Sequence, residues 1–163
     1  MNHDNILIRT ILPGDNRELA VIIRNSLEEF GAARPGTVYF DPTTDRLYEL
    51  FQTPGSHYFT ALAHDKLCGG GGIYPSKGLP AGTCELVKMY LRPNVRGKGL
   101  GKAIIEKCLA FAKTAGYEKV YIETLPELLK AMSVYERAGF RYLDAPLGDT
   151  GHFGCEVWML KDL

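Results

Sequence analysis

A short turn rich in glycine and basic residues carries the clearest chemical signal in this sequence of 163 residues. It follows a β-rich segment, precedes a helix-forming segment and reads Arg96-Gly97-Lys98-Gly99-Leu100-Gly101-Lys102. Glycines let an anion approach backbone N–H groups without meeting a Cβ, and a helix start offers unpaired N–H groups with a partial positive charge. Because basic side chains surround the same point, we expect the turn to bind a pyrophosphate.

Two widespread phosphate-binding patterns do not fit this turn. A P-loop requires a glycine where Arg96 stands, and a Ser or Thr where Ala103 stands. A dinucleotide-binding fingerprint requires a glycine where Lys102 stands. The turn therefore favours a pyrophosphate ligand of another class, and a glycine-rich helix start without any ligand is the alternative.

The elements that must position this turn are predicted from apolar periodicity and from the placement of glycine and proline. Strands are expected over residues 6–9, 58–63, 67–74, 84–91, 119–124, 140–143 and 156–160, and helices over about 15–31, 99–115 and 126–138, with a short helix after 43–45. Asp15 and Glu18 have the spacing of a capping box at the first helix. Four consecutive glycines at 69–72 indicate a bulge or a close backbone contact. We expect one α/β domain over residues 1–163.

Two motifs stand within these elements. Arg96, Gly99 and Gly101 have the spacing Arg/Gln-x-x-Gly-x-Gly/Ala at a helix start after the fourth strand, and residues 135–140 read Tyr-Glu-Arg-Ala-Gly-Phe. On these motifs, and on the element order, the sequence resembles the GNAT superfamily of acetyl-CoA-dependent N-acetyltransferases. The resemblance covers nearly the whole chain. It implies a mixed, mostly antiparallel sheet of about seven strands, flanked by about four helices and splayed between strands four and five.

The resemblance implies that acetyl-CoA is the co-substrate. Its pyrophosphate is expected on residues 96–102, and its pantetheine arm on backbone groups of the fourth strand at Met89, Tyr90 and Leu91. A strand rises about 3.3 Å per residue, so Glu85 lies roughly 13 Å from Met89, towards the thioester end of the arm. Many family members have an asparagine where Leu128 stands, so that contact with the arm is in doubt here.

Attack of a neutral amine on a thioester needs a base, a group that stabilises the oxyanion, and an acid for the departing thiolate. The resemblance implies Glu85 as the general base, directly or through a water, with Glu123 as the second candidate and Tyr135 as the general acid. A backbone N–H at Met89 or Leu91 could polarise the carbonyl. The alternative interpretation is an ion-paired strand carboxylate for each glutamate and a core residue for the tyrosine.

The resemblance implies that the acceptor is bound by the first two helices, the loop between them and the last strand pair. The candidate binding residues there are Glu28, Glu29, Phe30 and Tyr39, with Phe40, Asp41 and Tyr48 nearby. Carboxylates and aromatic rings suit a cationic amine. Arg34 or His152 could instead face an acidic group of an amino-acid-like substrate. The expected acceptor is a small primary amine; a protein amine, or a non-catalytic acyl-CoA-binding module, is the alternative.

Composition narrows the classes of protein further. Lys plus Arg and Asp plus Glu each total 19, and this zero net charge argues against a general nucleic-acid binder. The four cysteines form no C-x-x-C pair, which favours buried thiols in a reducing compartment and no metal site. Neither a membrane-spanning stretch nor a signal peptide is recognisable, so we expect a cytoplasmic protein. A homodimer is compatible with the resemblance.

Overall fold

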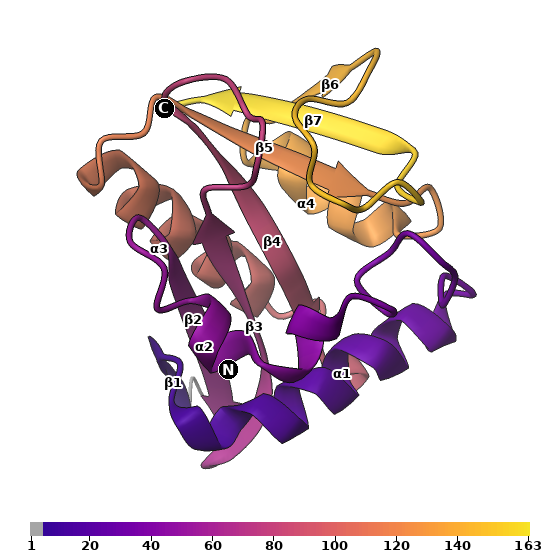
Figure 1. Ribbon diagram of the computed structural model, residues 1–163. Coiled ribbons are helices and arrows are strands. Elements are labelled where there is room, and N and C mark those ends of the chain that lie inside the picture. The colour runs from indigo at the N-terminus through magenta and orange to yellow at the C-terminus, as the bar shows by residue number, and fades with distance from the viewer. Residues whose placement is uncertain (1–4) are drawn as a thin grey trace.

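Seven strands form a single sheet with the order β1-β2-β3-β4-β5-β7-β6 (Figure 1). The computed structural model describes residues 5–163. Residues 1–4, which begin the N-terminal segment where no signal peptide is recognisable, lie outside the described residues. The strands are β1 (Ile6–Thr10), β2 (His57–Ala63), β3 (Lys66–Tyr74), β4 (Thr83–Leu91), β5 (Lys119–Thr124), β6 (Arg141–Leu143) and β7 (Val157–Asp162). Only the pairing of β4 with β5 is parallel among those described. The mostly antiparallel sheet that the family resemblance implies is confirmed.

Helices cover both faces of this sheet (Figure 1). They are α1 (Asn16–Glu29), α2 (Leu47–Leu50), α3 (Leu100–Thr114) and α4 (Leu129–Arg137), with short 3-10 turns η1 (Pro13–Asp15), η2 (Pro42–Asp45) and η3 (Pro93–Val95). One apolar cluster joins α1 and α2 to the sheet, and a second joins α3 and α4 to it. None of the helices within residues 5–163 has both the length and the hydropathy to cross a bilayer.

The strands β4 and β5 separate soon after they meet. Their pairing covers only Thr83–Glu85 on β4 and Lys119–Tyr121 on β5. Beyond Glu85, the edge of β4 that faces β5 therefore has no strand partner. The splayed sheet expected from the family resemblance is confirmed, and the opening it leaves is where the cavity described below lies.

A bulge in β4 accompanies this separation. Lys88 has a φ of +51°, which is rare for a residue with a side chain, and the β3–β4 register shifts between Gly70 and Gly72. A Cβ on Gly70 would lie 2.4 Å from the carbonyl oxygen of Phe59, and one on Gly72 would lie 2.7 Å from that of His57. The run of glycines thus allows close backbone contact next to a bulge, as the sequence predicts.

The start of α1 differs from the prediction. Asp15 does not cap the helix through its side chain. It accepts hydrogen bonds from the Leu12 N–H at 2.8 Å and from Arg9 at 2.7 Å, so its carboxylate faces the preceding turn. Glu18 pairs with Arg92 at 2.9 Å. The predicted capping box is wrong because both carboxylates have stronger, cationic partners elsewhere.

The start of α4 also differs, since the helix begins at Leu129 and not at Pro126. Arg34 holds the Glu127 carboxylate at 2.7 Å, and Leu128 has a ψ of 54°, outside the helical region. Pro126 to Leu128 therefore form a turn at the end of β5. This turn belongs to the rim of the cavity.

Candidate active site

A cavity of about 730 Å³ occupies the opening between β4 and β5. Its lining includes β4 from Glu85 to Leu91, the glycine-rich turn, and parts of α3, β5 and α4. A cavity of this size is typical of sites for cofactors and small ligands. It joins the sequence-predicted pyrophosphate turn to both predicted glutamates.

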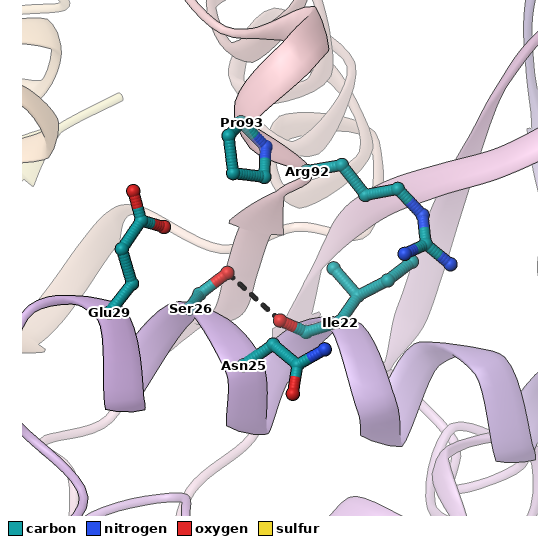
Figure 2. Close-up of a pocket in the computed structure, with 6 residues that line it drawn as sticks. All are labelled: Ile22, Asn25, Ser26, Glu29, Arg92 and Pro93. Carbon is teal, nitrogen blue, oxygen red and sulfur yellow. Dashed lines mark hydrogen bonds between the residues drawn. The ribbon is translucent and has the colours of Figure 1, made fainter.

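A second, smaller hollow of about 280 Å³ lies between α1 and the residues that follow β4 (Figure 2). Its polar groups include Ser26, whose hydroxyl donates to the Ile22 carbonyl at 2.8 Å, and Glu29. It contains neither of the glutamates nor the tyrosine expected to do chemistry. We therefore place the site in the larger cavity.

The glycine-rich turn forms one end of the large cavity. Gly97 and Gly99 have φ values of +75° and +85°, and Gly99 directly precedes α3. A Cβ on either glycine would meet no protein atom within 4 Å, so the space above them is open. Within residues 5–163, the N–H groups of residues 97–102 find no hydrogen-bond acceptor. This cradle of free N–H groups at a helix start is suited to an anion.

Arg96 anchors the turn to the rest of the protein. Its Nε donates to the Leu91 carbonyl at 2.9 Å, its guanidinium pairs with Glu29 at 2.9 Å, and it donates to the Ser26 hydroxyl at 3.3 Å. The guanidinium also lies 5.2 Å from the ring centre of Phe30. Arg96 thus holds the turn between β4 and α1, which leaves Lys98 and Lys102 as the more exposed positive charges.

The stretch of β4 between the turn and the glutamates lines the cavity with Met89, Tyr90 and Leu91. All three are half-buried, whereas the residues from Thr83 to Lys88 are buried. The Lys88 carbonyl accepts a hydrogen bond from the Tyr58 hydroxyl at 2.8 Å, which holds the bulge in place. The strand edge is therefore both unpaired and fixed, as an extended ligand would need.

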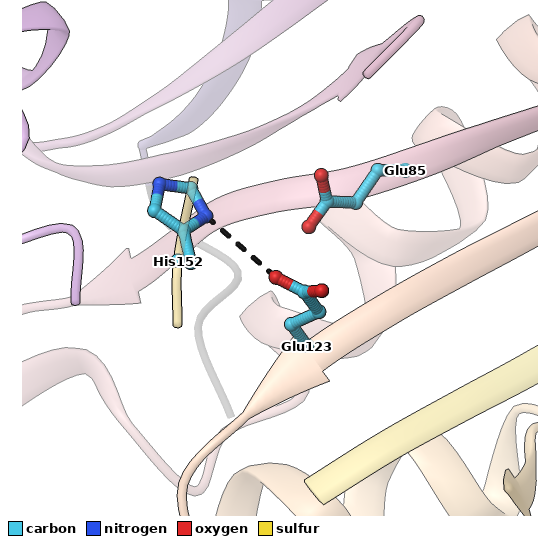
Figure 3. Close-up of side chains that lie close together, drawn as sticks. All are labelled: Glu85, Glu123 and His152. Carbon is cyan, nitrogen blue, oxygen red and sulfur yellow. Dashed lines mark ion pairs between the residues drawn. The ribbon is translucent and has the colours of Figure 1, made fainter. Parts of the chain in front are cut away.

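At the far end of the cavity, three polar side chains from distant parts of the sequence meet (Figure 3). Glu85 comes from β4, Glu123 from β5, and His152 from the loop between β6 and β7. One carboxylate oxygen from each glutamate and one imidazole nitrogen lie within 4.8 Å of one another. Within residues 5–163, these three side chains form a group close enough together to hold a cation, which could be a metal ion or a substrate ammonium.

Glu85 is the most deeply buried member, with 2% of its surface exposed. The Ser76 hydroxyl donates to one of its carboxylate oxygens at 2.5 Å. Burial raises the pKa of Glu85 to about 7, with the charge of Glu123 adding to the shift and the Ser76 hydrogen bond opposing it. A carboxyl group whose pKa lies near neutrality is well matched to proton transfer.

Glu123 is held by two hydroxyl groups. Tyr121 donates to one of its oxygens at 2.8 Å and Thr150 to the other at 2.5 Å. Thr150 belongs to the β6–β7 loop, so this carboxylate helps to fix that loop over the cavity. His152 follows two residues later in the same loop.

His152 joins the glutamates to a second charged pair. Its Nε2 lies 2.9 Å from the Asp41 carboxylate, and its Nδ1 lies 3.9 Å from Glu123. The Lys88 ammonium, with 3% of its side chain exposed, lies 3.3 Å from the same Asp41 carboxylate. Burial alone would raise the pKa of Asp41, but the His152 hydrogen bond and the Lys88 charge hold it well below its ordinary value. Asp41 is therefore a carboxylate at neutral pH.

Tyr135 lines the cavity from α4, with 6% of its surface exposed. Its hydroxyl has no hydrogen-bond partner in the part of the chain that the structure describes, residues 5–163. Burial raises the pKa of Tyr135, so the phenol carries its proton at neutral pH. It can therefore act as a hydrogen-bond or proton donor to a ligand.

Only some of the predicted acceptor-binding residues lie at the cavity. Phe30 lines the cavity, and Glu29 is engaged by Arg96. Glu28 and Tyr39 hydrogen-bond each other and are not among the residues that line the cavity. The structure instead brings Asp41, His152 and Lys88 to this end. Of these, sequence reasoning missed Lys88, although a single lysine inside the otherwise apolar residues 86–91 of β4 could have drawn attention to it.

Two loops meet over the same end of the cavity. The Gly154 N–H donates to the Gly36 carbonyl at 2.8 Å. A Cβ on Gly36 would lie 2.4 Å from the Gly154 nitrogen, so the contact requires glycine. Arg34 adds ion pairs to Glu127 at 2.7 Å and to Glu156 at 3.7 Å. The loop after α1 and the loop before β7 are thereby joined into a cover.

Comparison with known proteins agrees with this geometry. A family model described as "Acetyltransferase (GNAT) family" matches residues 23–140. An uncharacterized N-acetyltransferase of Escherichia coli K12, YjgM, is 39% identical over 158 residues, which are 96% of this chain and 95% of that protein. Among solved structures, a GNAT-family acetyltransferase from Staphylococcus aureus Mu50 superposes with a TM-score of 0.84 at 20% identity, covering 96% of this chain and 98% of the other. The PaiA N-acetyltransferase of Thermoplasma acidophilum, solved in complex with coenzyme A, gives a TM-score of 0.75 at 20% identity, covering 98% and 99% of the two chains.

Proposed function

The chain belongs to the GNAT family of acetyltransferases and is an acyltransferase, and from that premise we propose that it transfers an acetyl group from acetyl-CoA to a small primary amine. The observation that carries this proposal is the cavity itself. It connects a turn of unpaired N–H groups with a buried pair of glutamates along an unpaired strand edge. Such a path accommodates a ligand with an anion at one end and a reacting group at the other.

The cofactor is proposed to lie along this path. The pyrophosphate would accept hydrogen bonds from the N–H groups of residues 97–102, with Lys98 and Lys102 supplying charge. The pantetheine arm would pair with the free edge of β4 at Met89, Tyr90 and Leu91. Support comes from the open space above Gly97 and Gly99, and from the Thermoplasma structure, which is described as a complex with coenzyme A.

Glu85 is proposed as the general base and Tyr135 as the general acid, with Glu123 as the second candidate base. The pKa of Glu85, raised to about 7, suits a group that must take a proton near neutral pH. Tyr135 also lines the cavity, from α4, with a hydroxyl group that has no hydrogen-bond partner within residues 5–163. A backbone N–H of the bulged β4 would polarise the thioester carbonyl.

A small acceptor is favoured over a protein because the acceptor end is covered. The contact between Gly36 and Gly154 and the ion pairs of Arg34 close the cavity where a peptide would otherwise lie. The buried carboxylates of Glu85 and Glu123 favour a cationic amine over an anionic substrate. A cytoplasmic location is part of the proposal, and the four unpaired cysteines support it.

The test is a screen that measures release of the coenzyme A thiol with a panel of alkyl amines, amino acids and short peptides. We expect small primary amines to support turnover and peptides to fail. Acetyl-CoA at about one hundred times its Kd should stabilise the folded protein by about 2.7 kcal/mol and so raise its Tm. The absence of any Tm shift at millimolar acetyl-CoA would refute the cofactor assignment.

The role of Tyr135 has its own test. Tyr135→Phe keeps the ring that packs near Phe140, at 6.1 Å between ring centres, and removes only the hydroxyl group. We expect turnover to fall about tenfold or more while the Tm shift with acetyl-CoA is retained. Unchanged turnover would show that the proton of the departing thiol comes from elsewhere.

A further inference from the structure

An acceptor amine that arrives as an ammonium must lose two protons before it becomes an amide. One proton leaves for solvent, and the other ends on the coenzyme A thiol. Resting on the proposed function, we propose that His152, oriented by Asp41, takes the first of these protons and passes it to solvent, while Glu85 takes the second. His152 would thus be a catalytic residue in its own right, and Asp41 its positioning residue.

The hydrogen bonds of His152 decide which of its nitrogens can accept the proton. Asp41 is a carboxylate and can only accept, so His152 Nε2, 2.9 Å away, must carry the hydrogen of that bond. In a neutral imidazole the remaining nitrogen, Nδ1, then has a free lone pair. Nδ1 lies on the side of Glu123, at 3.9 Å (Figure 3). An imidazole nitrogen of His152 lies within 4.8 Å of a carboxylate oxygen of each glutamate. An ammonium held by the two glutamates would therefore present a proton to Nδ1.

Charged side chains from several elements surround His152. The charged groups that face it are Glu85 and Lys88 from β4, Glu123 from β5 and Asp41 before η2, with the Cys155 thiol from its own loop. Asp41 keeps its charge, since the hydrogen bond from His152 and the charge of Lys88 outweigh its burial. A cation at His152 would thus lie between the carboxyl groups of Asp41 and Glu123, at 2.9 Å and 3.9 Å.

Access to water distinguishes His152 from Glu85. The His152 side chain is 12% exposed and Asp41 is 21% exposed, whereas Glu85 as a whole is 2% exposed. The imidazolium can therefore release its Nε2 proton to solvent past Asp41, on the side of the ring that Asp41 contacts. A proton on the buried Glu85 has no such route to solvent. We therefore assign it to the thiol that forms in the same enclosed space.

Atoms and charge are conserved through the proposed reaction. The ammonium gives one proton to His152 Nδ1 and becomes a neutral amine. The imidazolium then releases its Nε2 proton to water past Asp41, and proton exchange with water returns the remaining hydrogen from Nδ1 to Nε2 before the next turnover. The amine nitrogen then attacks the thioester carbon, Glu85 takes the second N–H proton, and the C–S bond breaks. The sulfur receives a proton from Tyr135, which is restored by the one on Glu85. The net products are an amide, a free thiol and one proton in solution.

The experiment compares pH profiles of kcat/KM for the acceptor, with acetyl-CoA saturating, from about pH 6 to about pH 10. The probe is the amine of the panel that gives the highest kcat/KM with the wild type. For His152→Gln we expect a loss of about tenfold or more near pH 7, which shrinks as pH rises and the amine arrives already neutral. For Glu85→Gln the loss should persist at all pH values.

Two further variants keep the test decisive. Asp41→Asn retains an oxygen that can accept from His152 but removes the charge, so it should give a smaller loss with the same recovery at high pH. His64→Gln makes the same exchange at an exposed turn between β2 and β3 and should reproduce the wild-type profile. The Tm shift with acetyl-CoA verifies that each variant is folded.

Three outcomes would overturn the inference. His152→Gln could match the wild type at every pH, or it could lose the same factor at every pH, which would mark a role only in holding the loop. If the wild type released no thiol with any amine, the proposed function would fail first, and the inference with it. A loss that recovers with pH in His152→Gln and Asp41→Asn, but not in Glu85→Gln, supports it.

Discussion

The two ends of the cavity are built in opposite ways. At the turn of residues 97–102 the binding groups are backbone N–H groups, supplied by one continuous segment and open to solvent. At the other end the groups are the side chains of Glu85, Glu123 and His152, which come from three separate elements and are buried or nearly so. The first end follows from local sequence, while the second exists only when the whole sheet has formed.

This difference has a physical consequence for how each end responds to change. A cradle of N–H groups depends on backbone conformation, so it is sensitive to the glycines and tolerant of most side-chain changes. A buried cluster of titratable side chains depends on each member, because removal of one alters the protonation of the others. Substitutions at the two ends should therefore separate cofactor binding from turnover.

Glu85→Gln should produce the largest effect on turnover. The variant keeps the shape of the side chain and its contact with Ser76 but cannot accept a proton, so kcat should fall about 100-fold or more. The Tm shift with acetyl-CoA should be unchanged, because the cofactor turn lies at the other end of the cavity. A general base contributes far more than about threefold to turnover. A kcat within about threefold of the wild type would therefore exclude Glu85 as the base and assign that role to Glu123.

The same substitution should change the pH dependence of stability. Because the pKa of Glu85 is raised from 4.5 to about 7 in the folded state, the native protein holds this proton more tightly than the unfolded chain does. Stability from this group is therefore full below about pH 4.5 and is lost as pH rises through about 7, by about 3 kcal/mol at most. Glu85→Gln should gain stability relative to the wild type over that interval, measured by urea unfolding at several pH values. No relative gain would mean that the carboxylate is compensated in the folded state.

The cofactor end was predictable from sequence for a physical reason. Arg96, Gly99 and Gly101 are close in the chain, and glycine spacing at a helix start reports backbone conformation directly. The same locality explains why the strands and the α3 helix were predicted within a few residues. The role of Arg96 was less accessible, because its partners Glu29 and Ser26 lie on α1, far away in sequence.

The acceptor end was predictable only in part. Glu85 and Glu123 were identified through the family resemblance, and their proximity depends on the short parallel pairing of β4 with β5. The pairing of His152 with Asp41 joins residues 111 positions apart, and no local pattern encodes it. Glu28 and Tyr39 were expected in this site from the region that the family resemblance implies and from their charge and aromaticity, yet they bond each other outside the cavity lining.

Gly99→Ala should produce an intermediate effect that is confined to the cofactor end. Its φ of +85° makes any Cβ unfavourable by about 1 kcal/mol, and the new methyl group would stand in the open space above the N–H groups. We expect the Kd for acetyl-CoA, measured by calorimetry, to rise about tenfold, which is about 1.4 kcal/mol.

Gly116→Ala is the matched control for that prediction. Gly116 follows the other end of α3, has a φ of +92°, and likewise has no atom within 4 Å of an added Cβ. Both variants should lose similar stability in thermal unfolding, and only Gly99→Ala should lose affinity. Equal affinity in the two variants would mean that the cofactor does not approach the backbone at this turn.

Lys102→Ala should produce the smallest effect, and it tests whether charge adds to the backbone cradle. A lysine in the first turn of α3 is unfavourable for the free helix, because the N-terminus already carries a partial positive charge, and its Glu106 partner at 3.8 Å has the weaker orientation. Removal of the Lys102 side chain should therefore leave the free energy of unfolding of the cofactor-free protein unchanged or slightly higher. The affinity for acetyl-CoA should fall about threefold at low salt, and this loss should shrink as salt screens the exposed charge.

The control variant is Lys113→Ala, in the last turn of the same helix, which should leave the affinity for acetyl-CoA unchanged. If both lysines behave alike, the N–H groups alone account for anion binding, and the contrast between a backbone-built end and a side-chain-built end becomes complete.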